Sequence, residues 1–138
     1  MRELKVFIAE DNPGDVMVIE LALREEGIQY HLTPARDGED AVQLIKRMGK
    51  PNEPACPDVM LLDLNLPKVT GVEVLAEFRK HPECRETPVV VVTSTALPSE
   101  MADIQQLGPV HYFQKTVHLD EFLKLGKYVA EVASIQNS

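Results

Sequence analysis

The sequence has 138 residues, with 14 basic and 22 acidic side chains that give a formal net charge of −8. This length predicts one domain with a substantial core. The acidic balance excludes an ordinary nucleic-acid-binding protein, because that affinity depends on Lys and Arg neutralising phosphates. Apolar runs are too short to cross a bilayer and the N-terminus lacks the apolar core of a signal peptide, so we expect a cytoplasmic protein without membrane contact.

Two cysteines, Cys56 and Cys84, show no metal-binding spacing and no disulfide framework. We therefore interpret both as ordinary small residues in a reducing cytosol. The four histidines also lack metal-ligand spacing, and we interpret them as structural or exposed. They are His31, His81, His111 and His118.

The first half of the chain alternates strand patterns with helix patterns. Residues 4–9 form an apolar run that predicts a strand. A helix follows, and either Asn12 or Asp11 can cap it. Residues 30–35 predict a second strand, in which Pro34 favours an edge position in the sheet.

A second helix is predicted after the Asp37-Gly38 turn, because apolar residues follow the i, i+3, i+4, i+7 spacing. These residues are Ala41, Leu44, Ile45 and Met48. Residues 49–57 hold three prolines and a glycine, which predict a loop. The loop is too short to join two domains, so we expect one domain over residues 1–138.

The stretch at residues 59–67 is the centre of the predicted fold. Its continuous apolar run suits a strand that is covered on both faces of a parallel sheet. The strand ends on one acid, Asp63, and a helix begins at Gly71 after a short turn. The inward positions of that helix are predicted to be Val72, Leu75 and Ala76.

The remaining pattern predicts a strand, a helix, a strand and a helix. In order, they are expected at residues 89–92, 98–107, 110–113 and 119–133. The first of these strands ends at Thr93, and the second ends near Lys115. The last helix is predicted to bury four apolar residues and to be followed by a polar tail from about residue 134. The four are Phe122, Leu125, Val129 and Val132.

Five strands that alternate with five helices predict a doubly wound α/β fold with a parallel sheet. The flavodoxin-like strand order 2-1-3-4-5 agrees with an edge position for Pro34. In this order the ligand site lies where the first and third strands end. Glu10, Asp11 and Asp63 stand at those two ends.

Three carboxylates at neighbouring strand ends repel one another, so we expect a divalent cation between them. A hard cation with oxygen ligands and retained waters indicates Mg²⁺. Thr93 could donate a hydroxyl and Lys115 an ammonium to a phosphoryl oxygen.

Each of these residues also has a plain structural interpretation. Glu10 and Asp11 could be acids that favour a helix start, and Asp63 could be a turn residue. Thr93 could belong to a helix cap, and Lys115 could be a solvated lysine. Their joint placement at four strand ends favours a chemical site.

The motifs resemble the receiver domain of two-component response regulators, the family of the chemotaxis regulator. The resemblance extends over the whole chain. It rests on Glu10-Asp11, Asp63-Leu64-Asn65-Leu66-Pro67 with Gly71, Thr93, Tyr112 and Lys115.

The resemblance implies that Asp63 accepts a phosphoryl group from the phosphohistidine of a sensor histidine kinase. It implies that Asp11 and Asp63 bind Mg²⁺ directly, together with the main-chain carbonyl of Asn65. Glu10 would reach the metal through water.

The same resemblance implies that Thr93, Lys115 and Tyr112 form the switch that responds to the phosphoryl group. One residue departs from the family pattern, because Thr116 stands where a proline is usual after the lysine. A cis bond before a non-proline residue costs about 2.5–4 kcal/mol, which favours a trans Lys115–Thr116 bond.

A closer resemblance is to single-domain regulators that are paired with bacterial phytochromes. It implies a receiver without an output domain that acts on an effector or a downstream phosphotransfer protein. It also implies a homodimer through the last helix and the fifth strand, where Leu119 and Leu123 offer an apolar flank.

Two other functions fit part of the pattern. One is a Mg²⁺-dependent phosphohydrolase with an aspartyl nucleophile, but Asn65 stands where such an enzyme needs a second acid. The other is a degenerate receiver used only for binding, against which the intact acid set speaks. We therefore expect a phosphoacceptor switch rather than a dedicated enzyme.

Overall fold

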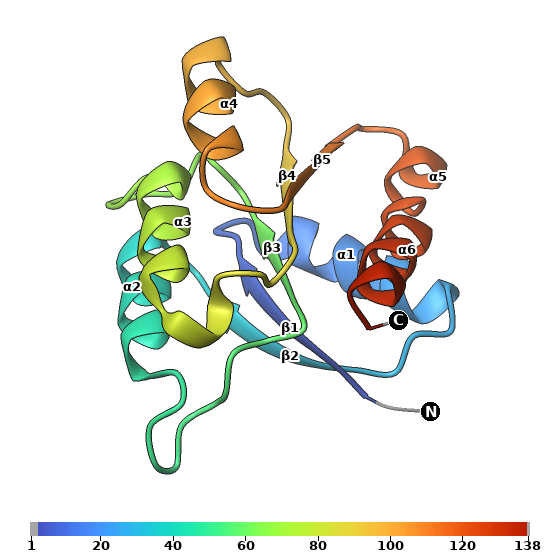
Figure 1. The fold of residues 1–138 in the computed structure, drawn as a ribbon. Coiled ribbons are helices and arrows are strands. Elements are labelled where there is room, and N and C mark those ends of the chain that lie inside the picture. The colour runs from blue at the N-terminus through green and yellow to red at the C-terminus, as the bar shows by residue number, and fades with distance from the viewer. Residues whose placement is uncertain (1–2, 138) are drawn as a thin grey trace.

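The computed structural model describes residues 3–137 of the chain, with side chains through residue 133. Five parallel strands form one sheet in the order β2-β1-β3-β4-β5 (Figure 1). The strands are β1 (Leu4–Ala9), β2 (Tyr30–Ala35), β3 (Val59–Leu62), β4 (Val89–Thr93) and β5 (Val110–Gln114). The predicted strand order is confirmed, and Pro34 does lie on an edge strand. Every residue of β3 and β4 is buried, as continuous apolar runs require.

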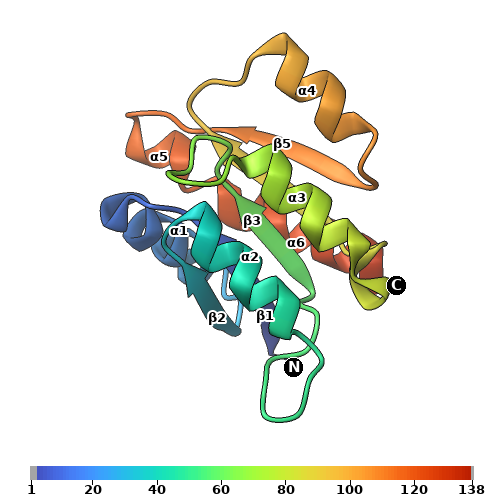
Figure 2. The same ribbon diagram turned by 90° about the vertical axis from the view of Figure 1, so that its left-hand side faces the viewer.

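Helices cover both faces of the sheet (Figures 1 and 2). One layer holds α1 (Pro13–Glu25), α5 (Leu119–Phe122) and α6 (Leu125–Asn137). The other holds α2 (Gly38–Arg47), α3 (Gly71–Lys80) and α4 (Pro98–Gln105), and a short 3₁₀ turn, η1 (Pro82–Cys84), follows α3. Two separate apolar cores result, one on each side of the sheet.

The end of the chain differs from the prediction in two ways. The expected single helix is divided into α5 and α6, because Lys124 N and Gly126 N donate to carbonyls three residues back and interrupt the α-helical pattern. The helix also continues to Asn137, four residues beyond its predicted end. Residues 134–137 contain neither Pro nor Gly, and nothing local therefore stops the helix.

The inward face of α3 is also shifted from the prediction. Val74, Leu75 and Phe78 are fully buried there, whereas Val72 and Ala76 are only partly buried. Their i, i+1, i+4 spacing still gives one apolar stripe along the helix. The stripe shares Leu75 with the predicted one, but its other members differ.

A disulfide joins Cys56 and Cys84, with 5.8 Å between their Cα atoms. The interpretation of two ordinary thiols is therefore wrong, and so is the support that it gave to a reducing cytosol. The cysteines lie 28 residues apart in the sequence, and only the fold brings the loop before β3 against η1. Among the described residues, no helix is long and apolar enough to cross a membrane.

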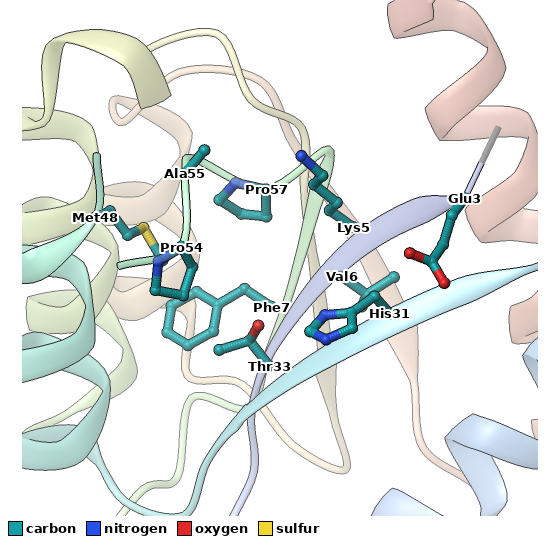
Figure 3. Close-up of a pocket in the computed structure, with 10 residues that line it drawn as sticks. All are labelled: Glu3, Lys5, Val6, Phe7, His31, Thr33, Met48, Pro54, Ala55 and Pro57. Carbon is teal, nitrogen blue, oxygen red and sulfur yellow. The ribbon is translucent and has the colours of Figure 1, made fainter. Parts of the chain in front are cut away.

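A pocket of about 310 Å³ lies at the amino end of the strands, beneath the loop before β3 (Figure 3). Neighbouring residues of β1 and β2 form its floor, where Lys5 is paired with His31 and Phe7 with Thr33. Met48 and the loop residues Pro54, Ala55 and Pro57 complete the wall. This end of the sheet is lined mainly by apolar side chains.

The guanidinium of Arg79, near the end of α3, is half-buried and donates to four backbone carbonyls. Two of them, Cys84 O at 2.8 Å and Thr87 O at 2.6 Å, precede β4. The other two, Leu107 O and Pro109 O, belong to the loop between α4 and β5. One side chain thus ties three segments together.

Candidate functional site

The carboxyl ends of β1 and β3 bring three predicted acids together. Asp63 N donates to Ala9 O at 3.0 Å, which aligns the two strand ends. Oxygen atoms of Glu10, Asp11 and Asp63 lie within 4.8 Å of one another. Glu10 and Asp63 are only 4% and 6% exposed, whereas Asp11 is open to solvent. The prediction of an acid cluster at this switch point is confirmed.

Lys115 is the cation that faces this cluster. Its Nζ lies 2.6 Å from Glu10 Oε1, 3.0 Å from Asp63 Oδ2 and 2.7 Å from Asp15 Oδ2. Lys115 N donates to Thr93 O at 2.9 Å, which extends the β4–β5 pairing by one residue and places the side chain over the acids. The peptide bond to Thr116 is trans, since no cis bond occurs among the described residues.

Thr93 and Asn65 complete the polar contacts of Asp63. The fully buried Thr93 hydroxyl donates to Asp63 Oδ1 at 3.1 Å, and Asn65 N donates to the same oxygen at 3.0 Å. The Asn65 side chain donates to Thr93 Oγ1 at 3.1 Å. The carboxylate of Asp63 is therefore held at both oxygens, with one edge toward Lys115 and the other toward Thr93.

Burial and ion pairing move the pKa values in this site in different directions. Burial raises the pKa of Glu10 to about 7, and the charge of Asp63 adds to the shift although Lys115 opposes it. Burial alone would also raise the pKa of Asp63, but Asn65 N, Lys115 and Thr93 outweigh it and lower this pKa. Burial would lower the pKa of Lys115, but its bonds to the acids, led by Asp15, raise it instead.

Two glycines allow the backbone to close tightly around the site. A Cβ atom on Gly71 would lie 2.5 Å from Leu64 Cα, and one on Gly38 would lie 1.9 Å from Val69 O. Gly71 N donates to Leu64 O at 3.1 Å. The turn after Asp63 is thus packed against the start of two helices without room for a side chain.

The acids fit a divalent cation by their chemistry. Three carboxylates converge, and only one ammonium among the described residues pairs with them. Hard oxygen donors of this kind suit Mg²⁺ or Mn²⁺. The main-chain carbonyl of Asn65 and a water-mediated role for Glu10 stay predictions.

Tyr112 lies apart from the acids. It is paired with Val91 across β4 and β5, and its side chain is 37% exposed. Its predicted switching role stays a prediction.

Asp15 is the residue that the sequence did not single out. It lies in the first turn of α1, where Asn12 Oδ1 caps the helix by accepting from Gly14 N at 2.9 Å and Asp15 N at 3.3 Å. Its carboxylate is one of the three that Lys115 binds. A signal was present, because Asp15 is an acid in the first turn of the helix that directly follows Glu10 and Asp11.

A second recess of about 400 Å³ borders the acids between α1 and β2. Glu10 and Asp11 line it together with Val16, Leu32 and Arg36. Two of the three acids therefore border a recess beside α1.

Comparison with known proteins places these features in a family. The family model described as "Response regulator receiver domain" matches residues 6–126. The response regulator Rcp1 of Synechocystis sp. is 31% identical over 120 residues, which are 87% of this chain and 82% of that protein.

Solved structures agree with this match. The phosphorylated cyanobacterial phytochrome response regulator RcpA is 32% identical, with a TM-score of 0.82 over 94% of this chain and 93% of that chain. The Mn²⁺-bound form of Rcp1 is 30% identical, with a TM-score of 0.80 over 93% and 92%. The receiver domain of the Pseudomonas aeruginosa kinase PA1611, with magnesium in its active-site cleft, is 27% identical over 96% and 99%, with a TM-score of 0.73. The chain therefore belongs to the response regulator receiver domain family, whose members are phosphorylated on aspartate in two-component signalling.

Proposed function

We propose that Asp63 is the phosphoacceptor of this receiver and that a sensor histidine kinase supplies the phosphoryl group. The supporting observation is the way in which Asp63 is held. Its two oxygens contact Lys115 on one side and Thr93 with Asn65 N on the other, beside two further acids. Lys115 and the Thr93 hydroxyl can donate to a phosphoryl group on Asp63, and the two further acids can hold a cation that neutralises its charge.

In the proposed step, an Asp63 oxygen attacks the phosphorus of a phosphohistidine. A phosphorus–oxygen bond forms, the phosphorus–nitrogen bond breaks, and the imidazole nitrogen keeps the electron pair. The lowered pKa of Asp63 keeps its carboxylate ionised and able to attack at neutral pH. Lys115 and the Thr93 hydroxyl then turn from the carboxylate oxygens to oxygens of the phosphoryl group.

Glu10, Asp11 and Asp63, with the carbonyl of Asn65, would hold Mg²⁺. When bound, the metal supplies positive charge against the phosphoryl oxygens. The residues of the chain orient the acceptor, since Asn65 N and Thr93 fix Asp63 Oδ1 at 3.0 and 3.1 Å.

The phosphoryl group would act on a surface through Thr93. Movement of this buried hydroxyl vacates space at the end of β4, two residues beyond Val91, the β4 partner of Tyr112. We propose that Tyr112, now half-exposed, turns inward in response and biases a two-state surface of α4, β5 and the last helices. An effector or a downstream phosphotransfer protein would read that surface.

The input is proposed from the relatives. RcpA is a phytochrome response regulator by its name, and it aligns with nearly the whole chain. A kinase with a light-sensing module is therefore the proposed partner. Leu119, which is 51% exposed at the start of α5, supports the proposed homodimer surface of β5 and the last helices.

The alternative, a Mg²⁺-dependent phosphohydrolase, is disfavoured by Asn65. Its amide donates to Thr93 Oγ1 and to Thr95 O at 3.4 Å, so it stabilises the loop that follows β4. A carboxamide cannot serve as the general acid that such an enzyme uses at this position.

The test is phosphorylation by acetyl phosphate with Mg²⁺, followed by intact mass. The parent should gain one phosphoryl group, and Asp63→Asn should gain none. Asp103→Asn, which removes an exposed acid on α4, is the matched control and should label like the parent. Labelling of Asp63→Asn would refute the acceptor assignment, and steady turnover of a small phosphate ester would favour the hydrolase.

A further inference from the structure

Lys115 has more acidic partners than a phosphate-binding lysine needs. An ammonium has three N–H donors, and three carboxylates take all of them. Two of these acids, Glu10 and Asp63, belong to the group that can share a metal ion. The third, Asp15, lies outside that group among the described residues, although its Oδ2 is only 2.7 Å from Lys115 Nζ.

Asp15 and Lys115 are held in different ways. Asp15 sits on a helix whose first turn is fixed by the Asn12 cap, so its carboxylate has little freedom to follow the lysine. Lys115 carries its ammonium on a flexible four-carbon stem beyond β5. When a phosphoryl group appears on Asp63, Lys115 is the partner that has to move.

The carboxylate of Asp15 and a phosphoryl group on Asp63 compete for the same ammonium. A divalent cation at Glu10, Asp11 and Asp63 offsets most of their charge, but it leaves the carboxylate of Asp15 as a partner for Lys115. A phosphoryl group on Asp63 brings further negative charge to the same ammonium. The Lys115 side chain is only 12% exposed and that of Asp15 is 25% exposed, so water screens this contest less than it would on an open surface.

We propose that Asp15 is a positioning residue that competes with the phosphoryl group on Asp63 for the ammonium of Lys115. It holds Lys115 toward α1 in the unphosphorylated receiver and thereby weakens the phosphorylated state. This inference rests on the proposed function, and it adds a regulator of the phosphoryl group that lies outside the metal ligands and the switch residues.

The test uses beryllofluoride with Mg²⁺, which mimics a phosphoryl group, and measures its affinity by ¹⁹F NMR titration of the whole chain. Asp15→Asn should bind the analogue about 3- to 10-fold more tightly than the parent, the range of a partly screened ion pair. Asp15→Glu keeps the charge and should stay within about twofold of the parent. Unchanged or weaker binding by Asp15→Asn overturns the proposal.

A matched control separates this effect from a general loss of charge. Glu25→Gln removes the same charge from the far end of α1, about 15 Å along the helix, and should leave the affinity unchanged. In a Lys115→Gln background, Asp15→Asn should no longer alter the affinity, because the contested ammonium is gone. A gain of the same size in that background would show simple repulsion and would also overturn the proposal.

The outcomes distinguish the two levels of inference. If Asp63→Asn binds the analogue as well as the parent does, the proposed function fails. If Asp63→Asn blocks binding while Asp15→Asn leaves the affinity of the parent unchanged, only the role of Asp15 fails. Circular dichroism of each variant verifies that the fold is retained before titration.

Discussion

The two ends of the sheet are held together by different forces. At the carboxyl end, buried carboxylates surround one ammonium, and hydrogen bonds hold Asp63 in place. At the amino end, a mainly apolar pocket lies beneath the loop before β3 (Figure 3). The Cys56–Cys84 disulfide joins that loop to η1. One end keeps like charges close together, and the other is joined by a covalent bond.

The difference shows how the fold separates stability from chemistry. Clustered acids repel and are costly to bury, so the carboxyl end contributes reactivity at the expense of stability. The fully buried strands β3 and β4 connect it to the amino end, where nothing reactive has to be kept open. If this division holds, a change that lowers stability at the amino end should leave metal binding at the carboxyl end intact, and the reverse should also hold.

The largest expected effect is at the amino end. Reduction of the Cys56–Cys84 disulfide should lower the free energy of unfolding by roughly 2–4 kcal/mol, because the bond closes a long loop in the unfolded chain. Mg²⁺ affinity should change less than about twofold, since Cys56 precedes β3 and Asp63 follows it, at the opposite end of the strand. Denaturant melts and Mg²⁺ titrations with and without dithiothreitol measure both quantities. If dithiothreitol does not change the free energy of unfolding, the two cysteines are unpaired thiols. A large loss of Mg²⁺ affinity on reduction would show that the two ends of the sheet are not independent.

A matched pair of glycine substitutions compares packing at the two ends. Gly71→Ala forces a Cβ against the backbone of Leu64 and should cost about 2–3 kcal/mol while also weakening Mg²⁺ binding. Gly49→Ala, in the loop above the pocket, meets only side-chain atoms at 3.6 Å or more. Its cost should be about 1 kcal/mol, from the φ of +82° alone, and Mg²⁺ affinity should be retained. Equal costs in thermal melts would contradict the comparison.

A smaller, pH-dependent effect is expected from Glu10. Its pKa rises from the ordinary value of 4.5 to about 7 in the folded protein, so ionisation is disfavoured by folding. Below pH 4.5 the acid is protonated in both states and costs nothing; the cost grows as pH rises and is complete above about pH 7. In metal-free buffer, Glu10→Gln should therefore be more stable than the parent by up to about 3 kcal/mol at pH 8 and equal to it at pH 4. Urea melts across this range, with Asp11→Asn as an exposed-acid control, measure the difference; a pH-independent difference would exclude this origin.

The strands and most of the site could be predicted because their signals are local. Local sequence patterns predicted all five strands, and Pro34 predicted the edge. Strand order then carried Glu10, Asp11 and Asp63 to one place, since parallel strands end at the same edge of a sheet.

The features that escaped prediction depend on contacts between distant segments. The disulfide needs the loop before β3 to meet η1, and neither spacing nor composition encodes that meeting. In the sequence, Asp15 looks like an ordinary acid in the first turn of a helix. Its contact with Lys115, 100 residues later, exists only in the folded chain. The interruption between α5 and α6 lies where Gly126 packs against Ala22 of α1, with room for no Cβ.

The Arg79 guanidinium connects α3 to the segments that flank β4 and β5. Its carbonyl partners belong to the segment before β4 and to the loop that carries α4 into β5. A planar group with five fixed donors can hold such divergent acceptors at once, whereas a lysine ammonium with three rotating donors cannot. The loop that follows α4 is therefore tied to α3, so we expect α4 to move less at its carboxyl end than at its amino end.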